Sequence, residues 1–129
     1  MLLNSFFHIV GDATDNDGSF SVSVRLNPAH PIYRAHFPGQ PVTPGVCQLQ
    51  MVMEILSDRL GRRLVLTDVK NVKYMAVIVP DDVPLLSVDF RKVALEGEVC
   101  TLTAVLSHGS QVFSKMSMTC HVVRDHSDL

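Results

Sequence analysis

The chain has few cysteines, no tract of basic residues and no long hydrophobic run, and each absence excludes a class of protein. Its three cysteines, Cys47, Cys100 and Cys120, are odd in number and widely spaced, which argues against a disulfide framework or a zinc site. The 11 Lys and Arg residues are outnumbered by 13 Asp and Glu residues, so nucleic-acid binding has no compositional support. No apolar run approaches the roughly 20 residues that span a bilayer.

Neither an export signal nor a metal or cofactor site is predicted. Residues 1–10 lack a basic segment and read as a strand, not as a signal peptide. With the unpaired cysteines, this predicts a cytoplasmic protein in a reducing compartment. The paired aspartates at residues 15–17 and 81–82 fall in turn sequences, where solvation is a better interpretation than metal binding. No Gly-rich phosphate loop is present, and no cofactor is expected.

The length and composition predict one domain that forms oligomers. At 129 residues the chain can build its own core, and it has no low-complexity linker or internal repeat, so residues 1–129 are interpreted as a single domain. Its hydrophobic fraction of 47% and mean hydropathy of +0.22 are high for a small soluble chain. An interior of this size cannot hide all of these side chains, which favours a dimer.

Hydrophobic periodicity predicts an antiparallel α+β fold with strands before and after one helix. The helix is expected to begin with Thr43 as its N-cap and Pro44 at its first position, and to end near Leu60 with Gly61 as its C-cap. It is apolar nearly all round, including an apolar stripe that begins at Val46, which is typical of a buried helix. The period-two pattern predicts strands at residues 5–12, 19–26, 63–77, 84–93, 97–108 and 111–123, with residues 28–42 irregular.

The segment between the first strands and the helix has the composition of a catalytic loop. It reads His36-Phe37-Pro38-Gly39-Gln40-Pro41-Val42-Thr43-Pro44-Gly45-Val46, so prolines and glycines fix its backbone on both sides of the histidine. A neutral imidazole can take a proton near neutral pH, which makes His36 the candidate general base. Pro44 has no N–H, so the amides of Gly45 and Val46 are the first donors that could stabilise an oxyanion at the helix N-terminus.

This loop resembles the HFPG-x-P-x-x-PGV signature of the FabZ-type 3-hydroxyacyl-acyl-carrier-protein dehydratases. Residues 30–35, 69–74 and 79–82 are also similar to that family, so the resemblance covers most of the chain, from about Asn4 to Val123. It implies a hotdog fold, in which a curved antiparallel sheet wraps a long helix, and a homodimer. It also implies dehydration of a 3-hydroxyacyl thioester carried by acyl-carrier protein or coenzyme A.

The sequence departs from the family at its catalytic carboxylate. That carboxylate stands fourteen positions after the histidine, where this chain has Gln50, and the usual glutamine four positions later is Glu54. Gln50 can donate a hydrogen bond but cannot transfer a proton. Glu54 lies one helical turn further along the same side, about 6 Å away, where partial burial would suit an acid. The alternative is that Glu54 forms a salt bridge at the helix edge or the dimer seam.

Three functions remain open on the sequence alone. The first is an active dehydratase whose acid is Glu54 or a water held by Gln50. The second is another hotdog activity, such as thioester hydrolysis, in which Gln50 orients a water. The third is a weakly active or non-catalytic acyl-thioester or carrier-binding subunit, one form of which would pair with a related hotdog subunit. An acidic carrier protein could dock on a basic rim drawn from Arg34, Arg59, Arg62, Arg63, Lys70 and Lys73.

Cys47 allows two interpretations. A cysteine near a helix N-terminus can become a reactive thiolate. More often such a residue is a small apolar filler, and no histidine is paired with it in the sequence, so the filler is favoured.

Overall fold

The computed structural model describes residues 1–14, 19–35 and 39–123. Part of the aspartate-rich turn and the first three motif residues, among them the candidate base His36, lie outside these ranges. The helices are α1 (Pro31–Ala35) and α2 (Gly45–Leu60). The strands are β1 (Phe7–Thr14), β2 (Phe20–Leu26), β3 (Leu64–Tyr74), β4 (Leu86–Phe90), β5 (Ala94–Glu96), β6 (Val99–His108) and β7 (Gln111–Val122).

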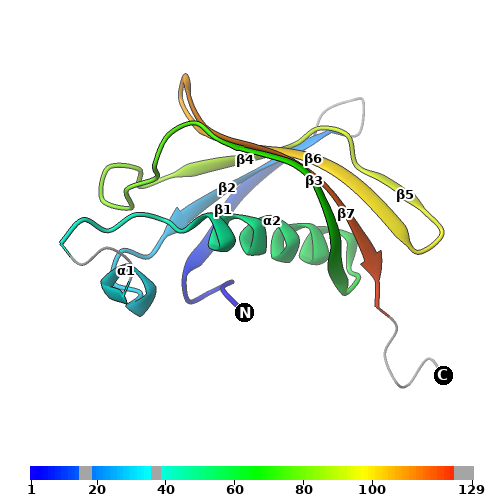
Figure 1. Ribbon diagram of the computed structural model, residues 1–129, viewed down its shortest axis with the longest axis horizontal. Helices are drawn as coiled ribbons and strands as arrows, with labels where there is room; N and C mark the ends of the chain where they lie inside the picture. The colour runs from blue at the N-terminus through cyan, green and yellow to red at the C-terminus, as the bar shows by residue number, and fades with distance from the viewer. Residues whose placement is uncertain (15–18, 36–38, 124–129) are drawn as a thin grey trace.

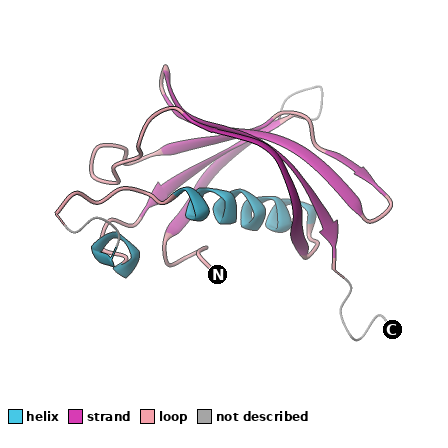
Figure 2. Cartoon of the chain, viewed as in Figure 1, coloured by secondary structure: helices cyan, strands magenta, loops and turns pink. Residues whose placement is uncertain are grey.

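A curved antiparallel sheet wraps around the long helix α2, as Figure 1 shows. The strand order is β1-β2-β4-β6-β7-β3, and β5 adds a second partner to β6. Helix α2 runs along the concave side of the sheet, while α1 stands beside the segment that leads to it (Figure 2). The predicted α+β architecture with a central helix is therefore confirmed.

The core lies between α2 and the concave face of the sheet. Strands β2 and β4 alternate between buried and more exposed residues, as a sheet with one covered face requires. The inward side chains meet the fully buried middle of α2, which supplies Met51, Val52, Ile55 and Leu56. Val46 differs from its prediction, because it is 72% exposed and not part of the core.

The N-cap of α2 is Pro44, not Thr43 as predicted. Pro44 has an extended backbone (φ −60°, ψ 146°), and the helical residues begin after it. The Thr43 side chain cannot cap the helix because it is buried and its Oγ1 bonds to the Tyr33 hydroxyl at 2.9 Å. At the other end the prediction holds, since Gly61 has a left-handed backbone (φ 63°) and its N–H donates to the Asp58 carbonyl.

Two short elements were not predicted. Helix α1 falls in a segment expected to be irregular; it begins at Pro31, and the Ile32 N–H donates to Nδ1 of His30 at 3.1 Å. A proline at the first helical position suits this start, but five residues are too few to show helical periodicity. Strand β5 has three residues, and it was expected to be the junction between two longer strands.

In the described structure β1 and β3 lie at the two ends of the main strand order, and β3 is the one beside α2 in Figure 1. Strand β3 exposes the apolar side chains of Val65, Val69 and Tyr74. An edge with free backbone groups and apolar side chains is suited to pairing with another chain. Among the described residues, no helix is both long enough and apolar enough to cross a bilayer.

Candidate active site

The start of α2 presents backbone donors, as the sequence indicated. The amides of Cys47 and Gln48 donate to the Pro44 carbonyl at 3.0 and 3.1 Å. Within the described part of the chain, the N–H groups of Gly45 and Val46 have no protein acceptor. They are at the positive end of the helix dipole and could receive a developing oxyanion.

Tyr74 packs directly against the start of this helix. A Cβ added to Gly45 would lie 2.7 Å from Cζ and 2.7 Å from the hydroxyl oxygen of Tyr74, so this contact requires glycine. Burial raises the pKa of the Tyr74 hydroxyl, although half of the residue remains exposed. Sequence reasoning placed Tyr74 only in a strand, and nothing in its neighbours indicated that it would meet Gly45, 29 positions away.

A buried polar network holds the loop before α2. Oγ of Ser114 donates to Oε1 of Gln48 at 2.8 Å, and Nε2 of Gln48 donates to the Thr43 carbonyl at 3.3 Å. The Thr43 N–H donates to the Ile78 carbonyl at 2.8 Å, and burial raises the pKa of its other partner, Tyr33, to about 12. Sequence reasoning missed Gln48. The signal that could have found it is an amide side chain in the buried part of an apolar helix, because such a group needs hydrogen-bond partners.

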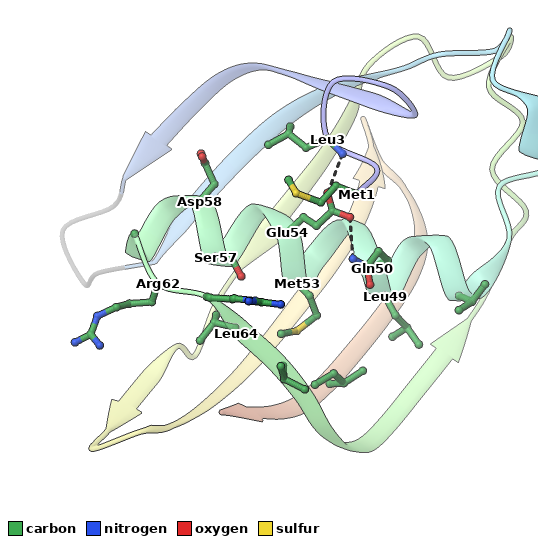
Figure 3. A pocket seen from close by; sticks show the side chains of 15 residues that line it. Met1, Leu3, Leu49, Gln50, Met53, Glu54, Ser57, Asp58, Arg62 and Leu64 are labelled. Carbon is green, nitrogen blue, oxygen red and sulfur yellow. Dashed lines mark hydrogen bonds between the residues drawn. The ribbon is translucent and has the colours of Figure 1, made fainter. Parts of the chain in front are cut away.

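Gln50 and Glu54 are joined by a hydrogen bond. Nε2 of Gln50 donates to Oε2 of Glu54 at 2.8 Å (Figure 3). The same carboxylate accepts the Leu2 N–H at 2.9 and 2.8 Å and the Leu3 N–H at 2.8 Å. Glu54 is buried, and each of these partners donates to it, so the carboxylate acts as an acceptor in all of these contacts. Within the described residues its partners are amides, not the cation that a salt bridge would need.

A pocket of about 900 Å³ opens between α2 and β3 beside this pair. Its walls include three of the predicted site residues, Val46, Gln50 and Glu54. Figure 3 shows Gln50 and Glu54 side by side at this wall. Apolar side chains supply much of the lining: Met1, Leu3, Leu49, Met53, Leu64 and Leu66. A largely apolar pocket with a few polar groups is typical of a site for a small or chain-like ligand.

Cys47 does not line this pocket. Its side chain is buried, and burial raises the pKa of the thiol, which disfavours the thiolate. The contacts support the interpretation of Cys47 as an apolar filler. Among the described residues, no group of three or more His, Cys, Asp and Glu side chains is placed to hold a metal ion.

The arginines at the end of α2 fall into two groups. Arg59 interacts with other parts of the protein: its Nη1 lies 2.8 Å from Oδ2 of Asp12, and its guanidinium carbon lies 4.5 Å from the centre of the Phe20 ring. Arg62 and Arg63 are exposed and line the pocket. Of the basic residues considered for carrier docking, these two are therefore the ones placed at the pocket.

Comparison with known proteins identifies a dehydratase family that this chain matches. Residues 12–117 match the ApeI-like family, described as ApeI dehydratase. A 3-hydroxyacyl-acyl-carrier-protein dehydratase FabZ from Clostridium acetobutylicum is 32% identical over 69 residues, which are 48% of this chain and only 49% of that enzyme. The chain thus spans about half the length of this relative.

Solved structures place the chain in the hotdog fold that was predicted. The ApeI:P dehydratase heterocomplex from Xenorhabdus doucetiae is 20% identical, with a TM-score of 0.68 over 88% of this chain and 96% of that chain. A mutant thioesterase from Pseudomonas aeruginosa is 15% identical, with a TM-score of 0.60 over 87% and 79%. The likeness at these identities is one of fold, and the hotdog prediction is confirmed.

The contact between Gly45 and Tyr74 predicts a measurable change. In Gly45→Ala the new Cβ should push the half-exposed ring into solvent, so the Tyr74 pKa should fall toward its ordinary value of 10.0. The pKa of Tyr33 should stay at about 12. Tyrosinate absorbance in rapid pH-jump titrations measures both groups. Gly11→Ala is the matched control, because nothing lies within 4 Å of the added Cβ; an unchanged Tyr74 titration in Gly45→Ala would contradict the contact.

Proposed function

The chain belongs to the ApeI-like dehydratase family, and from this premise we propose that it dehydrates a 3-hydroxyacyl thioester in fatty-acid or related acyl-chain biosynthesis. The carrier would be acyl-carrier protein or coenzyme A. The observation that supports this most is that Val46, Gln50 and Glu54 line one largely apolar pocket, near the amides of Gly45 and Val46, which have no acceptor among the described residues. No cofactor enters the proposed reaction.

In the proposed reaction His36 removes the C2 proton of the thioester. The electrons of the C2–H bond first shift to the thioester oxygen and give an enolate. They then return to form the C2=C3 double bond as the C3–O bond breaks, and the hydroxyl leaves as water after gaining a proton. The N–H groups of Gly45 and Val46 stabilise the enolate oxygen in between. The acid is either Glu54 or a water held by Gln50. We favour the water as the acid. A protonated Glu54 would need an acceptor for its O–H group, and the partners of this carboxylate are donors.

The rest of the pocket suits an acyl chain on a charged carrier. Apolar side chains from α2 and β3 would contact the chain, and exposed Arg62 and Arg63 would meet the phosphate of coenzyme A or an acidic carrier protein. Arg59 is excluded from this role in the proposal because Asp12 and Phe20 already hold it.

We also propose that the working unit is a homodimer. The edge strand β3 forms one wall of the pocket and exposes Val65 and Val69, so a second copy paired along β3 would bury these side chains and close the pocket. The alternative is pairing with a related hotdog subunit, which the similarity to the ApeI:P heterocomplex favours.

Thioester hydrolysis is the second candidate activity. It is favoured by the similar fold of the Pseudomonas aeruginosa thioesterase and by an exposed Gln50 that could orient a water. A weakly active or non-catalytic carrier-binding subunit is the third. The products separate these candidates. Hydrolysis releases a free thiol, dehydration changes the acyl chain without releasing thiol, and a binding subunit catalyses neither reaction.

The direct test is hydration of a crotonyl thioester, the reverse of the proposed reaction, followed by loss of the enoyl absorbance. The native protein should hydrate it without releasing thiol, and His36→Ala should lose at least about a hundredfold in kcat, which is typical of a missing general base. His126→Ala, which changes a histidine outside the motif, is the control. Full turnover by His36→Ala would exclude the proposed base and, with it, this reaction.

Restoring a carboxylate at position 50 should increase dehydratase activity. Gln50→Glu is nearly isosteric and would place two carboxyl groups at the present 2.8 Å contact, so the pair would retain a proton and offer an acid. We expect kcat to rise about tenfold or more, with the gain lost as pH rises above the raised pKa of the pair. Unchanged or reduced kcat at every pH would instead favour Glu54 as the native acid, because repulsion would then disturb a working group.

The proposed dimer predicts different effects at the two sheet edges. Val69→Lys on β3 should raise the dimer dissociation constant at least tenfold, because it places a charge in the buried seam. Val10→Lys on β1 changes a similarly exposed valine at the opposite edge and should have no effect. Sedimentation at micromolar concentration measures both. If the native protein sediments as a folded monomer, the homodimer is rejected, and pairing with a related hotdog subunit remains as the alternative.

A further inference from the structure

We infer that Glu54 is a positioning residue that fixes the amide of Gln50, and that the pocket thereby prefers a 3-hydroxyacyl chain to a 3-oxoacyl chain. The inference rests on the proposed function, since it takes an acyl thioester as the ligand. It goes further by naming the two side chains through which the pocket selects the oxidation level at C3, and by giving Glu54 the role of positioning the other. It uses only residues that the structure describes.

The Glu54 carboxylate is held from two directions. The N–H groups of Leu2 and Leu3 reach it from the start of the chain, and the Gln50 amide reaches it from one turn earlier on α2. Leu2 and Leu3 are themselves anchored. The N–H groups of Ser5 and Phe6 donate to the Leu2 carbonyl at 3.1 and 2.7 Å, and the fully buried Phe6 ring stacks on Tyr33. The carboxylate therefore has little freedom to turn or to leave its place.

A fixed carboxylate determines which way the Gln50 amide faces. A carboxylate oxygen accepts hydrogen bonds, and of the two ends of an amide only the nitrogen donates them. The nitrogen of Gln50 must therefore face Glu54, and the amide oxygen is turned away from it, as Figure 3 shows. Gln50 is exposed and lines the pocket, so this oxygen is available to a ligand.

An amide oxygen that faces the pocket distinguishes the oxidation states of C3. A C3 hydroxyl can donate to it, a saturated chain offers nothing, and a C3 ketone brings its own lone pairs against it. A net hydrogen bond between neutral groups at an exposed site corresponds to a preference of about three- to tenfold. We expect the order of affinity to be 3-hydroxy, then saturated, then 3-oxo.

Replacing Glu54 by glutamine should reverse the amide. The new side chain can still accept from Leu2 and Leu3 through its oxygen, and its nitrogen then faces Gln50. Gln50 would turn over to accept that hydrogen bond and would present its own nitrogen to the pocket. Glu54→Gln should therefore lose the preference for 3-hydroxy over 3-oxo chains, mainly through tighter binding of the ketone.

The experiment measures binding without turnover. The probes are four-carbon pantetheine amides with a saturated, a 3-hydroxy or a 3-oxo chain, in which N–H replaces the thioester sulfur and makes C2 a poor acid. Titration calorimetry gives the dissociation constants for the native protein, Glu54→Gln and Gln50→Met. Asp81→Asn makes the same change from carboxylate to amide at an exposed residue that does not line the pocket, and it should keep the native order.

Each outcome decides the inference. Native binding of the 3-hydroxy and 3-oxo amides with equal affinity would overturn it, and so would an unchanged ratio in Glu54→Gln. If Glu54→Gln does not fold, Gln50→Met decides: it should bind the hydroxy and saturated amides equally, and retention of the native preference would reject the assignment. Failure of all three amides to bind would overturn both this inference and the proposed function. If the native protein binds the three amides in the expected order but dehydrates no thioester, the proposed reaction is rejected and this inference stands.

Discussion

Burial of helix α2 is the constraint on which the rest of the structure depends. Most of its middle is apolar and buried, and a helix of this kind is stable in water only when other elements cover it. The concave face of the sheet covers one side, and the segment that begins the chain covers another, with Phe6 and Phe7 fully buried. The side toward β3 is left incompletely covered, and the pocket lies there.

The polar side chains within α2 follow from the same constraint. A buried amide or carboxylate is costly unless it is hydrogen-bonded. Gln48 therefore needs Ser114 and the Thr43 carbonyl, which ties the loop before α2 to strand β7. Glu54 needs the amides of Leu2 and Leu3, which ties the start of the chain to the helix. In the described structure no buried side-chain nitrogen or oxygen is without a partner, so each of these two polar residues fixes a neighbouring segment to α2.

The architecture could be predicted from the sequence because it depends on patterns that are local. Period-two alternation showed where β2 and β7 lie, and a glycine with a left-handed backbone ends α2 where expected. The N-cap was wrong because the Thr43 hydroxyl is used by Tyr33, a contact that no local pattern reveals. The partners of Glu54 were not predictable for the same reason: they are backbone amides more than 50 positions away, and every residue has such a group.

The exchange of carboxylate and amide between positions 50 and 54 changes what kind of group the pocket can use. A carboxylate at the exposed position 50 would be free to gain and lose a proton beside a ligand. At position 54 the carboxylate is buried among donors, which favour its charge and offer no acceptor for a proton. The exposed position then holds an amide, which does not titrate but has a donor end and an acceptor end. Selection at this wall of the pocket therefore depends on the direction of a hydrogen bond, and that direction is set by the buried charge behind it.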